Sequence, residues 1–102
     1  MRVAIGIEYD GAAFCGWQTQ PSGGAVEDAV ERAIARIGGA AAAVVAAGRT
    51  DAGVHALEQV AHFDAPAQRP LSAWLRGLNA WLPERAAVLW ACEVPDTFHA
   101  RR

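Results

Sequence analysis

The chain has 102 residues, a formal net charge of −2 and 53% hydrophobic residues. This composition is typical of one globular domain and excludes a disordered tail, which would have fewer apolar residues and more net charge. All nine basic residues are arginine, and eleven acidic residues outnumber them. The chain therefore has no overall positive field of the kind that drives general binding to polyanions.

Two cysteines, Cys15 and Cys92, lie far apart in the sequence and in no paired motif. They favour two reduced thiols in a cytoplasmic protein over a disulfide framework. The histidines and cysteines show no zinc spacing, so no metal is expected. The longest apolar run, residues 38–48, is too short to span a bilayer, and we expect no membrane segment.

The first part of the chain predicts a strand, a loop and a helix. Residues 2–9 alternate apolar and polar side chains, which indicates a strand, and Asp10-Gly11 predicts a turn. A loop rich in glycine, glutamine, proline and serine follows over residues 11–24. Apolar residues at helical spacing then predict a helix over 26–37, which Gly38-Gly39 ends.

The second part predicts two strands, a helix and a last strand. A short apolar strand over 43–47 leads into a polar loop, and alternation predicts strands over 57–64 and 88–94. A helix over 70–82 lies between them. Trp74, Trp81 and Trp90 lie on apolar stripes, so we expect core positions for all three.

The element order β-α-β-β-α-β predicts an α/β (α+β) fold of the ferredoxin-like type. Its sheet would have four antiparallel strands, with two helices on one face, and residues 1–102 would form a single unit. This fold hosts many unrelated activities, so function must be argued from the site.

The loop after the second predicted strand holds the densest set of chemical groups. Arg49 and Asp51 are two residues apart and project to the same side of an extended backbone. An arginine at that distance would keep the carboxylate ionised and oriented, as a nucleophile or base requires. The alternative is a surface ion pair in an Asx-type turn, which contributes little.

At this loop the sequence resembles the tRNA pseudouridine synthase A family. Residues 48–56, Gly-Arg-Thr-Asp-Ala-Gly-Val-His-Ala, are similar to the central active-site motif of that family over its whole length. Four further segments agree in order: Tyr9-Asp10-Gly11 with Phe14 and the Gly16-Trp17-Gln18-x-Gln20 stretch, Gln59–Phe63, Leu78–Pro83 and Phe98–Arg101. Together the matches cover nearly the whole chain.

The resemblance implies isomerisation of uridine to pseudouridine in the anticodon stem-loop of tRNA, without cofactor or metal. Asp51 would be the nucleophile, and Arg49 would orient it and assist base flipping. The remaining candidates shape the loop or contact RNA: Gly48, Thr50, Gly53, His55, Trp17, Gln18, Gln20 and Arg101.

Family members are more than twice as long as this chain, so the resemblance implies an N-terminal half whose C-terminal half is absent here. It also implies a homodimer. Whether Asp51 attacks the ribose C1′ or uracil C6, or removes a C2′ proton, stays open. A non-catalytic ferredoxin-like RNA-binding module is the alternative, because the chain alone would leave the cleft of the family half-built.

Overall fold

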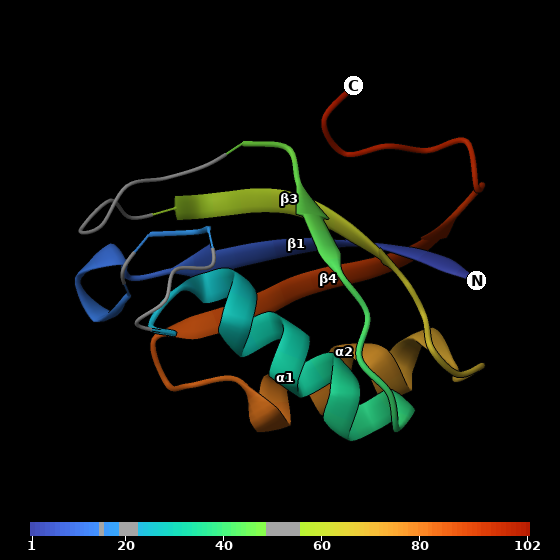
Figure 1. Ribbon diagram of the computed structural model, residues 1–102, viewed down its shortest axis with the longest axis horizontal. Coiled ribbons are helices and arrows are strands. Elements are labelled where there is room, and N and C mark those ends of the chain that lie inside the picture. Colours follow the sequence, from blue (N-terminus) through green and yellow to red (C-terminus); the bar gives the residue numbers. More distant parts are fainter. Residues whose placement is uncertain (15, 19–22, 49–55) are drawn as a thin grey trace.

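The computed structural model describes residues 1–14, 16–18, 23–48 and 56–102 (Figure 1). Its elements follow the predicted order, with one added turn of 3-10 helix, η1. They are β1 (Arg2–Tyr9), η1 (Gly11–Ala13), α1 (Val26–Gly38), β2 (Val44–Ala46), β3 (Ala56–Asp64), α2 (Leu71–Trp81) and β4 (Ala86–Val94).

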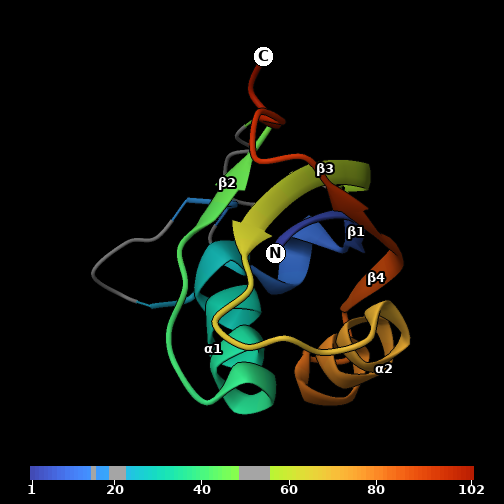
Figure 2. The same ribbon diagram turned by 90° about the vertical axis from the view of Figure 1, so that its right-hand side faces the viewer.

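The four strands form one antiparallel sheet in the order β2-β3-β1-β4. Both helices lie on one face of this sheet, side by side, as Figure 2 shows. The chain order and the strand order together confirm the predicted ferredoxin-like fold. Strands β1 and β3 are central, so the segments that leave their ends lie near the middle of the sheet.

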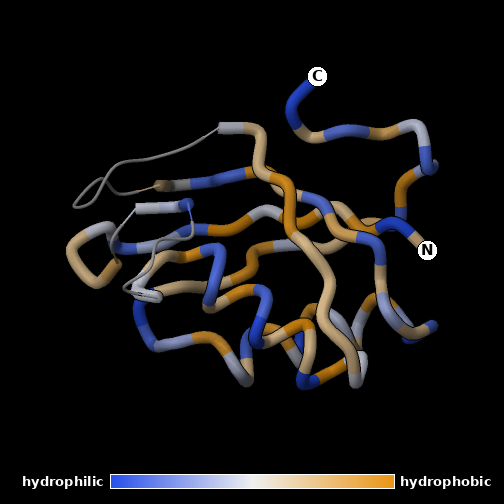
Figure 3. Tube along the Cα trace, in the orientation of Figure 1, coloured by the Kyte–Doolittle hydropathy of each residue, from blue (hydrophilic) through white to orange (hydrophobic). Residues whose placement is uncertain are grey.

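The core fills the space between the sheet and the helices. Val3, Ile5 and Ile7 of β1 are fully buried, and they alternate with residues that face away from the helices. Helix α1 contributes Val30 and Ile34, which are also fully buried. Figure 3 shows the apolar stretches along the strands and both helices that border this layer. Burying each such side chain stabilises the fold by about 1.5–3 kcal/mol.

Helix α1 has the ends that its sequence predicts. Glu27 and Asp28 lie in its first turn, where the helix dipole favours acidic side chains, and Arg36 lies in its last turn. Gly39 takes a left-handed conformation with φ of 78°, and its N–H donates to the Ala35 carbonyl. A residue with a Cβ would be strained there, so glycine is the residue that ends the helix.

The expectation that three tryptophans lie in the core is right for Trp74, which is fully buried, and wrong for Trp81, which is 55% exposed. Trp81 is the last residue of α2, and its ring lies 4.8 Å from the Arg36 guanidinium carbon. Its ring therefore lies against Arg36 on the surface of α1. The apolar stripe of α2 extends past the edge of the core, so the last residue of the helix is not covered.

Trp90 is half-buried on the face of the sheet that carries no helix, which corrects its expected place. Ile7 pairs with Val88, but Gly6 pairs with Trp90, so Leu89 is an extra residue in β4. Such a bulge shifts the alternation by one residue. Val88 consequently faces the core while Trp90 faces away, although both belong to one alternating set in the sequence.

Candidate active site

The loop with Arg49 and Asp51 connects β2 to β3. Arg49, Thr50, Asp51, Gly53 and His55 lie outside the described residues, so the structure places only the two ends of the loop. The Ala47 N–H donates to the Val60 carbonyl at 2.8 Å, and Ala56 pairs with Tyr9 of β1. The chain therefore rejoins the sheet at Ala56, where β1 ends and β4 begins.

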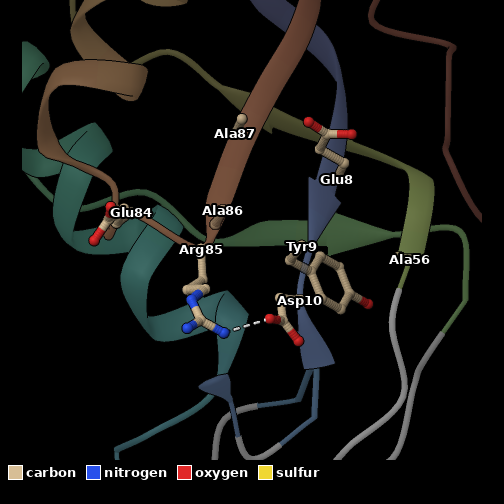
Figure 4. A pocket seen from close by; sticks show the side chains of 8 residues that line it. All are labelled: Glu8, Tyr9, Asp10, Ala56, Glu84, Arg85, Ala86 and Ala87. Carbon is tan, nitrogen blue, oxygen red and sulfur yellow. Dashed lines mark hydrogen bonds and ion pairs between the residues drawn. The ribbon is translucent and has the colours of Figure 1, made fainter. Parts of the chain in front are cut away.

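A pocket of about 380 Å³ lies at this end of the sheet (Figure 4). Its walls come from the end of β1, the first residue of β3 and the beginning of β4. The lining residues are Glu8, Tyr9, Asp10, Ala56, Glu84, Arg85, Ala86 and Ala87. Ala56 directly follows the Arg49–Asp51 loop, so this loop enters the sheet at the pocket wall.

Asp10 and Arg85 close one side of the pocket. The Arg85 guanidinium contacts the Asp10 carboxylate at 2.6 Å, and the Asp10 N–H donates to the Arg85 carbonyl at 2.9 Å. The other Asp10 carboxylate oxygen accepts the Ala12 N–H at 3.0 Å, as in an Asx turn. The predicted turn at Asp10-Gly11 is confirmed, and it joins the start of β4 to the end of β1.

Trp17 lies in the core beneath the pocket. Its side chain is 2% exposed, and its ring centroid lies 6.2 Å from that of Tyr9, which contacts Phe14 at the same distance. The Trp17 carbonyl accepts the Glu27 N–H at the start of α1. Its burial favours a packing role over the expected RNA contact. The neighbouring Gln18 is exposed, and Gln20 lies outside the described residues.

Gln59 binds Gly48, the described residue that precedes the Arg49–Asp51 loop. Its side-chain amide donates to the Gly48 carbonyl at 2.8 Å and accepts the Gly48 N–H at 3.3 Å. Gln59 is 9% exposed and lies on the core side of β3, with Ala61 and Phe63. Both polar ends of this buried amide therefore bond to a single residue.

Arg101 lies beside the end of β2. Its Nε–H donates to the Ala46 carbonyl at 3.4 Å, two residues before Gly48. The Ala100 N–H donates to Nδ1 of His62 at 3.1 Å, which holds this segment against β3. Figure 2 shows the C-terminal segment beside β2. The tertiary structure thus brings the Phe98–Arg101 motif to the strand that leads into the Arg49–Asp51 loop.

Charged groups around β1 fix this C-terminal segment further. The Arg2 guanidinium contacts both oxygens of Asp64, at 2.9 and 3.1 Å, and donates to the Phe98 carbonyl at 2.7 Å. The hydrogen bond from Arg2 lowers the pKa of Asp64. Burial lowers the pKa of His62, as do the charges of Arg2 and His99, and this favours the neutral ring.

Comparison with known proteins identifies the family. A family model described as tRNA pseudouridine synthase matches residues 5–101. The chain belongs to the tRNA pseudouridine synthase family. It is 62% identical to a protein of Chromobacterium violaceum and 60% identical to one of Dechloromonas aromatica, both named tRNA pseudouridine synthase A. Each alignment covers 99% of this chain but 39% and 38%, respectively, of the relative.

In this member of the pseudouridine synthase family, the structure brings two of the predicted segments together at one end of the sheet. The Tyr9-Asp10-Gly11 turn and Ala56, the last residue of the 48–56 motif, meet there, and Arg101 contacts β2 at Ala46. Among the described residues, no group of three or more histidine, cysteine or acidic side chains is arranged to hold a metal. No helix in the described part is long and apolar enough to cross a membrane.

The sequence interpretation did not identify two residues at this site, Arg85 and Gln59. No local pattern indicates the role of Arg85, because its partner Asp10 is 75 positions away. A local pattern does indicate Gln59, since the alternation of β3 places a polar side chain on the face that also carries Ala61 and Phe63. A buried amide needs partners for both of its polar ends, so its place in that pattern points to a structural bond.

Proposed function

We propose that this chain is the N-terminal unit of an enzyme that isomerises uridine to pseudouridine in the anticodon arm of tRNA. Family membership over residues 5–101 supports this proposal most strongly. The complete motif of residues 48–56 adds to it, because its last residue, Ala56, lines a pocket. Asp51 is the proposed nucleophile, and Arg49 is the proposed partner that orients it.

The reaction moves one bond. The bond from uracil N1 to the ribose C1′ breaks, the uracil rotates, and its C5 bonds to C1′. C5 then loses its proton and N1 gains one, so the product is an isomer of the substrate and no electrons are transferred. One carboxylate is sufficient for such a sequence, and the chemistry calls for no cofactor. Its first step is attack at C1′, attack at uracil C6 or removal of the C2′ proton.

The target nucleotide must leave its stack before a carboxylate can reach it. Arg49 suits this step, since a guanidinium can pair with Asp51 and then contact phosphate or fill the vacated stack. In this proposal Gly48, Thr50 and Gly53 shape the loop, and His55 orients it by a hydrogen bond. Gln18, Gln20 and Arg101 contact the RNA.

The curated relatives are more than twice as long as the chain. We propose that a second, similar unit completes the cleft and supplies the aromatic side chain that packs on the target base. We also propose that the complete enzyme is cytoplasmic and forms a homodimer.

The decisive test is Asp51→Asn in the gene that encodes this chain. Asparagine keeps the size of the side chain and removes the anionic nucleophile, so we expect pseudouridine in the anticodon arm to fall at least about 10³-fold. The matched control is Asp96→Asn, a carboxylate-to-amide change at an exposed position outside the pocket. It should leave modification unchanged. Near wild-type modification in the Asp51→Asn strain would exclude Asp51 as nucleophile.

A further inference from the structure

Gln59 takes over the pairing between β2 and β3 where the backbone ladder stops. The ladder runs from Val44 opposite Phe63 to Ala46 opposite Ala61. The backbone N–H and carbonyl of Gly48 form hydrogen bonds with the Gln59 side chain in place of the β3 backbone. This side chain offers one donor and one acceptor, as a peptide group does. The amide thus holds Gly48 beside β3 after the strand has ended.

The bonding pattern makes this contact specific. A buried amide costs free energy unless its donor and its acceptor both find partners, and Gly48 supplies both. Breaking the contact would leave four polar groups without these partners: the two ends of the Gln59 amide, and the N–H and carbonyl of Gly48. The amide therefore has a strong preference for one backbone position.

That position is the base of the proposed catalytic loop. Gly48 directly precedes Arg49 and lies three residues before Asp51, while the far end of the loop is fixed by the pairing of Ala56 with Tyr9. Among the described residues, no heavy atom outside Gly48 and its two chain neighbours lies within 4 Å of where a Cβ on Gly48 would be. Steric contact therefore does not hold this backbone on that side, and the Gln59 amide does.

We propose that Gln59 is a positioning residue for the catalytic loop: its amide sets the backbone of Gly48 and through it the reach of Asp51. The proposal rests on the proposed function. Because the Gln59 amide is bonded to Gly48 and buried, it acts through the loop and not on the RNA. Its loss should consequently lower kcat and leave KM nearly unchanged.

The test uses the whole gene product and a tRNA substrate, with kcat and KM measured from pH 5.5 to 8. Gln59→Leu removes both hydrogen bonds at similar size, and we expect kcat to fall about 10–100-fold at every pH, since misplacement by about 1 Å costs up to about 10²-fold. KM should stay within about twofold, because no RNA contact is lost. Thermal melting confirms that the variant is folded at the assay temperature.

Gln59→Glu supplies a readout that a general loss of stability would not give. A protonated glutamic acid has one donor and one acceptor, as the amide does, whereas the ionised form has no donor for the Gly48 carbonyl. The ratio of variant to wild-type kcat should therefore rise several-fold as the pH falls from 8 to 5.5. The matched control is Glu58→Gln, one residue away and exposed, whose ratio should stay flat.

The outcomes separate the two proposals. If the wild-type protein forms pseudouridine and Gln59→Leu retains its kcat, Gln59 is not a positioning residue. The same conclusion follows if the Gln59→Glu ratio does not change with pH. If the wild-type protein itself forms no pseudouridine, the proposed function fails, and the positioning role fails with it.

Discussion

At the scale of single residues, His62 shows how burial and hydrogen bonding select one protonation state. Its Nδ1 accepts the Ala100 N–H at 3.1 Å, so the proton of the neutral ring lies on Nε2. Its ring also contacts His99, at 4.9 Å between centroids, and Phe98. A proton on Nδ1 would remove the acceptor and put a charge beside His99 and near Arg2.

This arrangement predicts a loss of stability in mild acid. The folded pKa of His62 lies below its usual value of 6.5, so the unfolded chain takes up the proton first as the pH falls. The contribution of His62 is complete above pH 6.5 and is lost progressively as the pH falls from 6.5 through the lower pKa of the folded state. His62→Asn keeps an acceptor without titrating. Its melting temperature should therefore decrease less than that of the wild type between pH 7.5 and 5.5.

Among the described residues, Glu31 also makes stability depend on pH, because burial raises its pKa, and its effect on the free energy of unfolding has the opposite sign to that of His62. It is present in both proteins, so it cancels in the difference between them. Parallel melting curves for the wild type and His62→Asn across this range would contradict the assignment of a neutral, bonded His62.

At the scale of elements, the contact of β1 with β4 depends on Gly6. A Cβ on Gly6 would lie 2.3 Å from Nε1 of Trp90, whose ring covers this glycine. The indole N–H donates to Glu58 at 3.1 Å, which fixes the ring across three strands. The Trp90 ring approaches the Gly6 backbone so closely that only glycine fits at this position.

Gly6→Ala should therefore destabilise the protein by about 1–3 kcal/mol, although alanine is ordinarily better than glycine inside a strand. The measurement is the free energy of unfolding in denaturant, for Gly6→Ala alone and in a Trp90→Ala background. Because the clash disappears with the indole, the cost of Gly6→Ala should be lower by about 1 kcal/mol or more in that background. Equal costs in both backgrounds would show that Trp90 does not cause the effect.

Local patterns predicted the elements well, and the errors lie where pairing decides. The strand over 88–94 begins at Ala86 in the structure, because Ala86 and Ala87 pair with Tyr9 and Glu8. Two alanines have no strand preference of their own, so only the neighbouring strand could reveal them. The bulge at Leu89 is likewise a property of the pair of strands.

At the scale of the whole molecule, the charge around the pocket limits what the chain can do alone. Among the described residues, three carboxylates, from Glu8, Asp10 and Glu84, line it with one guanidinium, that of Arg85. Because RNA affinity comes largely from cations placed against phosphates, this arrangement gives little attraction. It agrees with the net charge of −2.

We therefore expect the purified 102-residue chain to bind tRNA weakly and to form no pseudouridine, while the whole gene product does both. Filter binding and a turnover assay on the same tRNA transcript measure the two activities. Tight binding without turnover would favour the non-catalytic RNA-binding module. Turnover by the short chain would show that no second unit is needed for catalysis.

The sequence by itself determined the ferredoxin-like order of elements, the buried faces of β1 and α1, and the motif that holds Arg49 and Asp51. These features depend on periodicity and on residues close together along the chain. Only the tertiary structure decided that Trp17 is buried in the core while Trp90 lies on the face of the sheet without helices. It also decided that Arg85 pairs with Asp10 and that Gln59 holds Gly48. Those contacts join distant segments, and they depend on register, bulges and the meeting of strand ends, which local patterns do not encode.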